Sequence, residues 1–277
     1  MKAVICYSGG HGSALAAIEA ARRYGKENVI LLNHDISADV EHYDIKRFKD
    51  EVAEYIGVEI TSANMEGWEN LTPLKISILN KAFQFSPGRA LCTYYLKTAP
   101  FQSWLKENYP AWQYVLEDRV HDEIIILYGL EASEGERIAR RRLFLMGEGY
   151  QSDYPLAYWK RTIEKTEDIG IKRPVTYSVY KHANCVGCLK AGRQHWYCVY
   201  CLRPDIWEEA VQAEDEIGYS IINGTYLKDI EPQFYEMKYR KNICPSEKGN
   251  SQTFWARVNS IMPEQMTLFS IPCDCAF

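Results

Sequence analysis

The glycine-rich segment Tyr7–Ser13 (Tyr-Ser-Gly-Gly-His-Gly-Ser) most constrains how this chain of 277 residues folds. It separates the apolar run Ala3–Cys6, which predicts a strand, from Ala14–Tyr24, which predicts a helix. A strand that stops at such a turn and runs directly into a helix leaves several backbone N–H groups unpaired, with the positive end of the helix dipole behind them. The segment therefore predicts the first step of an α/β sheet and an anion site at the turn.

The residue types in this turn favour a phosphate as the anion. Glycines let the backbone approach a phosphate closely, and serine hydroxyls donate further hydrogen bonds. The turn lacks both the Lys-Ser/Thr ending of a Walker loop and the glycine spacing of the dinucleotide fingerprint. We therefore expect a pyrophosphate cradle formed by Ser8, Gly9, Gly10, Gly12 and Ser13, with an ordinary strand-to-helix turn as the alternative.

The next elements extend the α/β pattern. Asn28–Asn33 and Val58–Ser62 predict strands, and Asp39–Ile56 predicts the helix between them. Three strands separated by two helices form a βαβαβ unit, whose ligand site lies at the carboxyl ends of the strands. Asn33 and Asp35 are placed at such an end, so they are candidates to contact a ribose, an adenine or a metal ion. A polar loop without ligand is the alternative.

A second candidate anion site follows a predicted helix over Leu74–Phe85. Within Arg89–Pro100, the residues Arg89, Thr93 and Lys97 are four apart and share one face of an expected helix. The segment is otherwise apolar, so this face suits a phosphate or sulfate better than it suits solvent. An ordinary basic surface helix is the alternative.

The following segments contain one further strand and two charged or aromatic helices. Ile124–Tyr128 predicts a buried strand, residues 131–142 predict a charged helix, and a helix is expected near Trp159–Asp168. Arg137 is a weaker candidate for anion binding, because a run of arginines on a helix is more often a solvated face.

Six of the nine cysteines occur in closely spaced pairs: Cys185/Cys188, Cys198/Cys201 and Cys273/Cys275. In a reducing compartment such pairs indicate metal ligands before disulfides. The first pair holds two thiolates at tetrahedral spacing, and we expect the second pair to complete a four-cysteine zinc or iron–sulfur site. Two alternatives stay open: the third pair supplies the other ligands, or the cysteines are buried thiols without metal.

Composition bounds the remaining possibilities. The net charge of −5 argues against non-specific coating of nucleic acid. The start has no signal-peptide pattern, and the longest apolar run, Ile124–Leu127, is too short to span a bilayer, so we expect a cytoplasmic protein without a membrane partner. We expect an α/β domain over residues 1–150 and a cysteine-bearing, mostly helical region over residues 151–277, with a homo-oligomer left open.

Together these motifs resemble the pyrophosphatase-loop (PP-loop) ATP pyrophosphatases and the phosphoadenosine-phosphosulfate-reductase-like proteins of phage or bacterial type. The matching blocks are the Ser-Gly-Gly turn, the pattern Arg-x-x-Cys-Thr-x-x-x-Lys-x-x-Pro at Arg89–Pro100, Glu134 with Arg137, the Cys-x-x-Cys turn and the terminal Cys-x-Cys. Two positions depart from the family pattern. Gly12 stands where an Asp is usual, and Glu131 stands where an Arg is usual.

The resemblance implies a five-stranded, mainly parallel sheet of the adenine nucleotide alpha hydrolase-like (HUP) type. It also implies an enzyme that binds ATP and Mg²⁺, cleaves the α–β phosphate bond, adenylates an acceptor and releases pyrophosphate, in sulfur transfer or nucleobase modification. Arg89, Lys97 and Arg137 would offset developing charge, and Asp35 or the nucleotide itself would place Mg²⁺. The acceptor is not named by the sequence, and a nucleobase or nucleic acid is a candidate.

Two other functions stay open on the same resemblance. One is a sulfonucleotide reductase, although residues 271–277 lack the Glu-Cys-Gly-x-His tail of those enzymes. The other is an inactive nucleotide-binding or partner-binding module, which the departures at Gly12 and Glu131 suggest.

Overall fold

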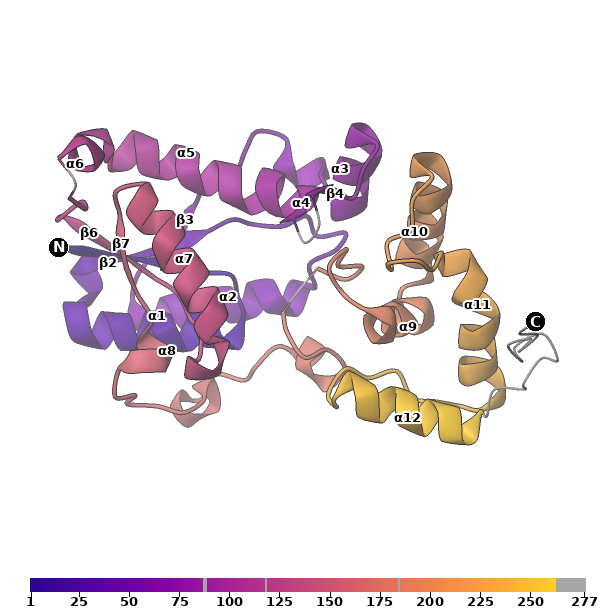
Figure 1. The fold of residues 1–277 in the computed structure, drawn as a ribbon. Helices are drawn as coiled ribbons and strands as arrows, with labels where there is room; N and C mark the ends of the chain where they lie inside the picture. The colour runs from indigo at the N-terminus through magenta and orange to yellow at the C-terminus, as the bar shows by residue number, and fades with distance from the viewer. Residues whose placement is uncertain (87–88, 118, 184, 263–277) are drawn as a thin grey trace, which may run out of the picture.

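The computed structural model describes residues 1–86, 89–117, 119–183 and 185–262 (Figure 1). Its centre is a five-stranded sheet in the order β3-β2-β1-β6-β7, and every neighbouring pair is parallel. The strands are β1 (Lys2–Cys6), β2 (Val29–Asn33), β3 (Ile60–Ser62), β6 (Ile124–Leu127) and β7 (Gln151–Asp153). In the register, Val4 of β1 pairs with Ile30 on one side and Ile126 on the other. The α/β class and the five strands are confirmed, and the sheet is parallel throughout.

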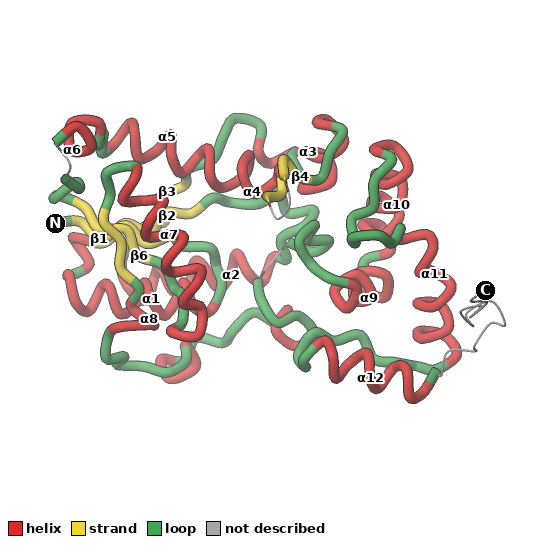
Figure 2. Tube along the Cα trace, in the orientation of Figure 1, coloured by secondary structure: helices red, strands yellow, loops and turns green. Residues whose placement is uncertain are grey.

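Helices cover both faces of the sheet, which explains why its central strands are apolar without alternation (Figure 2). One face packs on α1 (His11–Tyr24) and α2 (Tyr43–Ile56), with Ile5 of β1 in the same buried cluster as residues of both helices. The other face packs on α5 (Ala99–Asn108) and α7 (Gly135–Gly147), where Val4 shares a cluster with Leu105 and Leu145. Successive residues of β1 therefore enter opposite cores.

The strand order places a switch point beside β1. The chain runs from β1 to β2 and β3 on one side and then crosses to β6 on the other side of β1. In open α/β sheets a ligand crevice forms at such a point, outside the carboxyl ends of the strands. Here that point lies where β1 and β6 end.

Several element boundaries differ from the sequence predictions. The helix predicted from Asp39 begins at Tyr43, because the ring nitrogen Nδ1 of His42 accepts the Asp44 N–H and caps the helix there. The third strand begins at Ile60 rather than at Val58.

The helix predicted over Leu74–Phe85 is also wrong beyond its second turn. The helix α3 (Pro73–Asn80) ends at Lys81, which adopts a left-handed conformation with φ 50°. The chain then forms the antiparallel hairpin of β4 (Gln84–Ser86) and β5 (Arg89–Ala90).

The α/β unit, expected to end at residue 150, continues to at least Ile171. β7 adds the fifth strand after that position, and Ile171 is buried in the core under α1 and α2. The helix expected near Trp159–Asp168 is replaced by α8 (Pro155–Tyr158), a non-helical stretch and η5 (Thr166–Ile169). The buried Glu19 carboxylate of α1 accepts the backbone N–H groups of Thr162 and Ile163 and so fixes this stretch.

Four helices form a second part of the molecule: α9 (Arg193–Leu202), α10 (Pro204–Ile217), α11 (Leu227–Tyr235) and α12 (Ser251–Ile261), with η6 (Val175–Ser178) before α9 and η7 (Glu236–Arg240) after α11. The chain before them also contains the short helices α4 (Leu91–Thr93) and α6 (Trp112–Leu116) and the helical turns η1 (Lys26–Asn28), η2 (Trp68–Asn70), η3 (Tyr94–Thr98) and η4 (Ala132–Glu134). In the described part of the chain, no helix has the length and apolar character needed to cross a bilayer.

The helical part packs against the carboxyl edge of the sheet through a shared core. Trp196 and Phe234 lie in one buried cluster with Ile36 and Val40, which follow β2. The Val186 N–H donates to the Val40 carbonyl oxygen at 2.9 Å. The two parts are therefore joined by hydrophobic packing beside the region where a ligand of the sheet would lie.

Candidate functional site

The glycine-rich loop leaves β1 and enters α1 without a side-chain cap. Gly10 is the N-cap residue with φ −79° and ψ 151°, and as a glycine it offers no side chain to cap the first helical turn. Gly9 adopts φ 74°, and a Cβ there would come within 2.8 Å of both Ile45 Cγ2 and Lys49 Cγ. Only glycine fits at position 9, because of both its backbone conformation and its packing against α2.

Hydrogen bonds inside the loop fix its shape and leave a set of donors free. The Ser13 hydroxyl donates to the Gly10 carbonyl oxygen at 2.8 Å, and the Ser8 N–H donates to Ser13 Oγ at 3.3 Å. Within the described residues, the N–H groups of Gly9, Gly10, Gly12 and Ser13 have no acceptor. These four donors, at the positive end of a 14-residue helix, are what an anion site requires.

The sequence alone does not identify two residues of this site: Tyr177, and His11 in a structural role. The His11 N–H donates to the Tyr177 hydroxyl at 3.0 Å, so this donor of the loop is already occupied. His11 Nε2 accepts the Thr166 N–H, and burial, with Arg173 adding to it, lowers the pKa of His11. His11 is therefore a neutral packing residue, and Tyr177 contributes a hydroxyl at the loop from 166 residues later in the chain. No spacing in the sequence connects Tyr177 with the loop.

Packing explains why position 12 is a glycine. A Cβ on Gly12 would lie 2.7 Å from the Gly129 carbonyl oxygen and 3.5 Å from Leu156 Cδ1. A Cβ on Gly129 would in turn collide with the Gly12 backbone. The start of α1 and the end of β6 thus approach each other backbone to backbone at the switch point, and an Asp side chain at position 12 does not fit this arrangement.

Asn33 lies at the carboxyl end of β2 and has an unused acceptor. Its side chain is buried at 4% exposure, and its Oδ1 atom has no hydrogen-bond partner among the residues described. Buried polar atoms are nearly always paired, so an unpaired one at a ligand edge indicates a missing partner. The neighbouring His34 is held by its Nδ1 contact with the Ala63 carbonyl oxygen at 2.5 Å.

Asp35 is compensated by two lysines of α2. Its Oδ1 accepts from Lys46 Nζ at 2.7 Å and from Lys49 Nζ at 2.9 Å, and Lys49 also pairs with Glu41 at 2.9 Å. Burial works to raise the pKa of Asp35, but the two lysine hydrogen bonds outweigh it and the pKa is lowered. The carboxylate is ionised but already neutralised, so it does not offer a free ligand for Mg²⁺.

The three predicted cations lie in different settings. The prediction that Arg89 shares a helical face with Thr93 and Lys97 is wrong, because Arg89 belongs to β5 and the helix begins only at Leu91. Lys97 lies in η3, a π-helical turn, and its charge lowers the pKa of His34 after the larger effect of burial. The segment with Lys97 lies beside the end of β2, because Phe101 of α5 packs edge-on against His34, whereas Arg89 is an exposed residue of β5.

Arg137 lies on the solvated face of α7. Its side chain is 63% exposed, and it pairs with Glu134 of η4. Glu131, the position where the family pattern has an Arg, pairs with Arg161 from the loop after α8. A guanidinium therefore lies beside this position, although it comes from a different segment.

The four predicted metal ligands are not gathered into one cluster. In the part of the chain that the structure describes, no group of three or more His, Cys, Asp and Glu side chains is arranged to hold a metal ion. Cys198 is fully buried on α9, and burial raises its pKa; Cys201 and Cys244 are the thiols that add to this shift. The alternative pair, Cys273 and Cys275, lies outside the described residues.

His195 fixes the turn between Cys185 and Cys188, since its Nε2 accepts the N–H groups of Gly187 and Cys188 at 3.2 Å. Burial raises the pKa of Cys185 to about 11, and the charge of Lys97 acts against this rise. Cys92 of α4 and Cys201 of α9 pack against the same hydrophobic cluster as Cys185.

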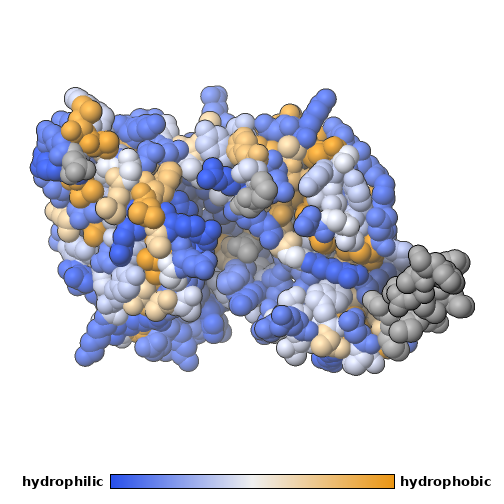
Figure 3. All heavy atoms as spheres, in the orientation of Figure 1, coloured by the Kyte–Doolittle hydropathy of each residue, from blue (hydrophilic) through white to orange (hydrophobic). Residues whose placement is uncertain are grey.

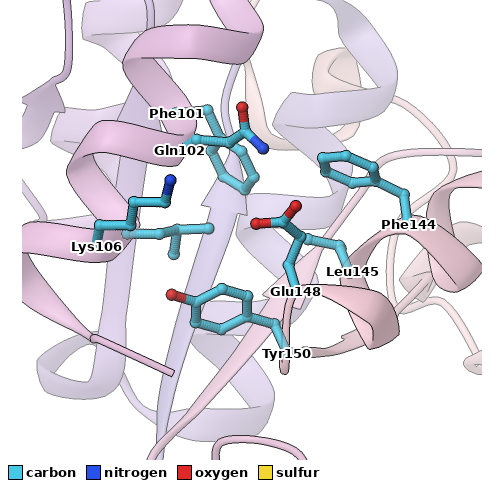
Figure 4. Close-up of a pocket in the computed structure, with 8 residues that line it drawn as sticks. Phe101, Gln102, Lys106, Phe144, Leu145, Glu148 and Tyr150 are labelled. Atoms are coloured by element: carbon cyan, nitrogen blue, oxygen red, sulfur yellow. The ribbon is translucent and has the colours of Figure 1, made fainter. Parts of the chain in front are cut away.

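Two surface pockets are separate from the loop. Figure 4 shows the first, between α5 and α7, lined by Phe101, Gln102, Leu105, Lys106, Phe144, Leu145, Glu148 and Tyr150. Its volume of about 10 Å³ has room for no more than one water molecule. The second, of about 280 Å³, is lined by helical residues including Tyr200, Trp207 and Lys238. Neither contains a residue of the glycine-rich loop.

Comparisons with protein-family models, with curated proteins and with solved structures give no match for this chain.

Proposed function

We propose that this chain is a PP-loop-like enzyme that binds ATP, cleaves its α–β phosphate bond to adenylate an acceptor, and releases pyrophosphate. The observation that carries the proposal is the set of four unpaired N–H groups at Gly9, Gly10, Gly12 and Ser13, located at the switch point of a parallel sheet. Anions bind at such helix N-termini, and nucleotides bind at such switch points. We also propose that the sheet is of the HUP type.

In this proposal each residue has a defined task. The loop N–H groups and the Ser8 hydroxyl hold the β- and γ-phosphates, and Tyr177 lends its hydroxyl at the same place. Asn33 Oδ1 accepts a hydrogen bond from the ribose or from the adenine amino group. Lys97 offsets the charge that develops as the α–β bond breaks. The catalysis is positioning and charge neutralisation, without a side-chain nucleophile.

The residues at the loop do not form a dedicated Mg²⁺ site. Asp35 is the nearest candidate from the sequence, and two lysines already compensate it. Mg²⁺ commonly keeps several waters and binds through substrate phosphates with one or two carboxylates. Mg²⁺ therefore belongs to the nucleotide in this proposal, where it would neutralise phosphate charge.

The packing reason for Gly12 weakens the alternative of an inactive module. That alternative rested on Gly12 and Glu131 as departures from the family pattern. Gly12 is required by its contact with Gly129, and Arg161 lies beside Glu131. Neither departure then needs a loss of activity to explain it.

Metal binding at Cys185 and Cys188 stays a prediction, for zinc or an iron–sulfur cluster. Cys198 and Cys201, the predicted second pair, lie on α9, and the described residues contain no group of three or more ligand side chains arranged around an ion. Elemental analysis of the purified protein tests whether a metal is present.

A single assay separates the proposed functions. The protein is incubated with ATP or with phosphoadenosine phosphosulfate, and the products are analysed for pyrophosphate and for sulfite. We expect pyrophosphate from ATP, with the rate reduced in Lys97→Ala. Release of sulfite from the second nucleotide would instead identify a sulfonucleotide reductase, and neither product would support the inactive module.

A further inference from the structure

Positive charge is concentrated in one part of this acidic chain. Residues 70–106 contain five Lys or Arg residues and no Asp or Glu, although the net charge of the chain is −5. The five are Lys75, Lys81, Arg89, Lys97 and Lys106, and all are exposed. Apart from Lys75, which lies 3.6 Å from Asp39, they form no ion pair within the described residues. A surface that serves solubility alone mixes both signs, so this separation indicates a negatively charged partner.

The same part of the chain carries exposed aromatic rings. Phe85 of β4 is 56% exposed and Tyr94 of η3 is 44% exposed. Their ring centroids are 5.5 Å apart with the planes at 86°, and Tyr95 packs edge-on against Tyr94 at 5.4 Å. The Tyr95 hydroxyl donates to Asn80 Oδ1, which ties this ring to α3. Exposed rings held in a fixed arrangement offer flat surfaces on which a planar group can stack.

Two of these rings and two of the cations lie on β4, β5 and the helical turn that follows them: Phe85, Arg89, Tyr94 and Lys97. Arg89 pairs with Ser86, the residue after Phe85. Figure 3 shows hydrophobic and hydrophilic residues side by side on the surface over α3, α4 and β4. Phe101 of α5, one turn beyond Lys97, packs edge-on against His34 at the end of β2, with ring centroids 6.1 Å apart. The surface is therefore continuous with the edge at which the nucleotide is proposed to bind.

We propose that this surface binds single-stranded nucleic acid, with an unpaired base stacked on Phe85 and Tyr94 and backbone phosphates held by Arg89 and the neighbouring lysines. Aromatic rings next to cations are the combination that binds single strands, because every base has a stacking face and every nucleotide a phosphate. A duplex keeps its bases stacked internally and cannot use the rings. The proposal rests on the proposed function only in naming the acceptor of the adenyl group as a nucleobase of the bound strand.

The test measures oligonucleotide binding directly and needs no ATP. A fluorescein-labelled single strand of about 12 nucleotides is titrated with the full chain, and fluorescence anisotropy is recorded with DNA and RNA probes and with the corresponding DNA duplex. We expect the single strands to bind more tightly than the duplex. The double variant Phe85→Ala/Tyr94→Ala should weaken single-strand binding about tenfold or more. The matched control is Tyr219→Ala, because Tyr219 is 55% exposed and lies outside the basic segment.

The charge contribution is tested by the salt dependence. Arg89→Ala should weaken binding at low salt and make the slope of log affinity against log salt shallower by about 0.7, the value for one phosphate contact on a single strand. Arg257→Ala is the control, since this exposed arginine of α12 forms no ion pair among the described residues. Circular dichroism establishes that the variants are folded.

Each outcome decides the proposal. Tighter binding of single strands, lost in the aromatic and Arg89 variants and kept in both controls, supports it. No binding of either single strand, equal loss in the controls, or a preference for duplex overturns it. A concentration-dependent dimer that the aromatic variants abolish, without oligonucleotide binding, would show that the surface joins two copies instead. Retained oligonucleotide binding with no ATP binding would overturn the proposed function and leave this surface as a nucleic-acid site.

Discussion

The substitution Gly12→Ala should destabilise the fold, because the added methyl group has no space. Its Cβ would lie 2.7 Å from the Gly129 carbonyl oxygen, closer than van der Waals contact, and that oxygen belongs to backbone fixed by β6. Overpacking of this kind costs about 1–3 kcal/mol. Ala is a better helix former than Gly by up to about 1 kcal/mol, which offsets part of the cost. We expect a net loss of about 1–2 kcal/mol in the free energy of unfolding.

Gly10→Ala is the matched control for this substitution. Its Cβ would lie 3.5 Å from Ser8 Oγ and 3.9 Å from the Tyr177 hydroxyl, which are ordinary contacts, and φ is −79°. The small penalty of Ala at an N-cap and the gain from a less flexible unfolded chain are of similar size, so we expect a change within about 0.5 kcal/mol. Urea unfolding with linear extrapolation measures both variants. Equal stability of the two would refute the close approach of α1 and β6, and with it our explanation of Gly12.

Three further predictions follow from other contacts. The stabilisation from Asp35, whose pKa is lowered in the folded state, is present above the unfolded-state pKa of about 4 and is lost as the pH falls through the lower folded-state pKa, so urea unfolding should show a larger difference between Asp35→Asn and wild type at pH 7 than at pH 3. Glu19→Ala should lower the free energy of unfolding by about 2–4 kcal/mol, since it leaves two backbone N–H groups without their acceptor; an unchanged value would contradict the anchoring of residues 162 and 163. If the protein carries a metal, Cys198→Ser/Cys201→Ser should retain it in elemental analysis, whereas its loss would restore these two cysteines as ligands.

Periodicity and turn chemistry in the sequence were enough to predict the parallel sheet. The strands β1, β2 and β6 contain the continuous apolar runs Ala3–Cys6, Val29–Leu32 and Ile124–Leu127, which is the pattern of strands covered on both faces. The segments that were mispredicted are held by contacts distant in sequence. The pattern of apolar and charged residues over 159–165 is typical of a helix. The Glu19 carboxylate nevertheless accepts the backbone N–H groups of Thr162 and Ile163 and holds the segment in a loop.

The candidate site was also predictable only where its residues are contiguous in the sequence. The loop Ser8–Ser13 is contiguous, so its donors could be located from local sequence alone. Tyr177 reaches the loop only through tertiary folding, and Arg89 lies off the expected helical face because it belongs to β5, which pairs with β4. The cysteines show the same limit, since their spacing suggested a four-ligand site while the described residues bring no three ligand side chains together.

Isothermal titration calorimetry with ATP and Mg²⁺, on the wild type and on Gly10→Val, tests the central claim that the loop binds a pyrophosphate group. Nothing in the packing around Gly10 forbids a side chain, so the variant should fold, and its side chain would stand beside the N–H donors. Gly192→Val is the control, because Gly192 is also an N-cap glycine, with φ −86° and no atom within 4 Å of an added Cβ. The account predicts that the wild type and Gly192→Val bind ATP and that Gly10→Val does not. Equal binding by all three proteins, or no binding by the wild type, would contradict it.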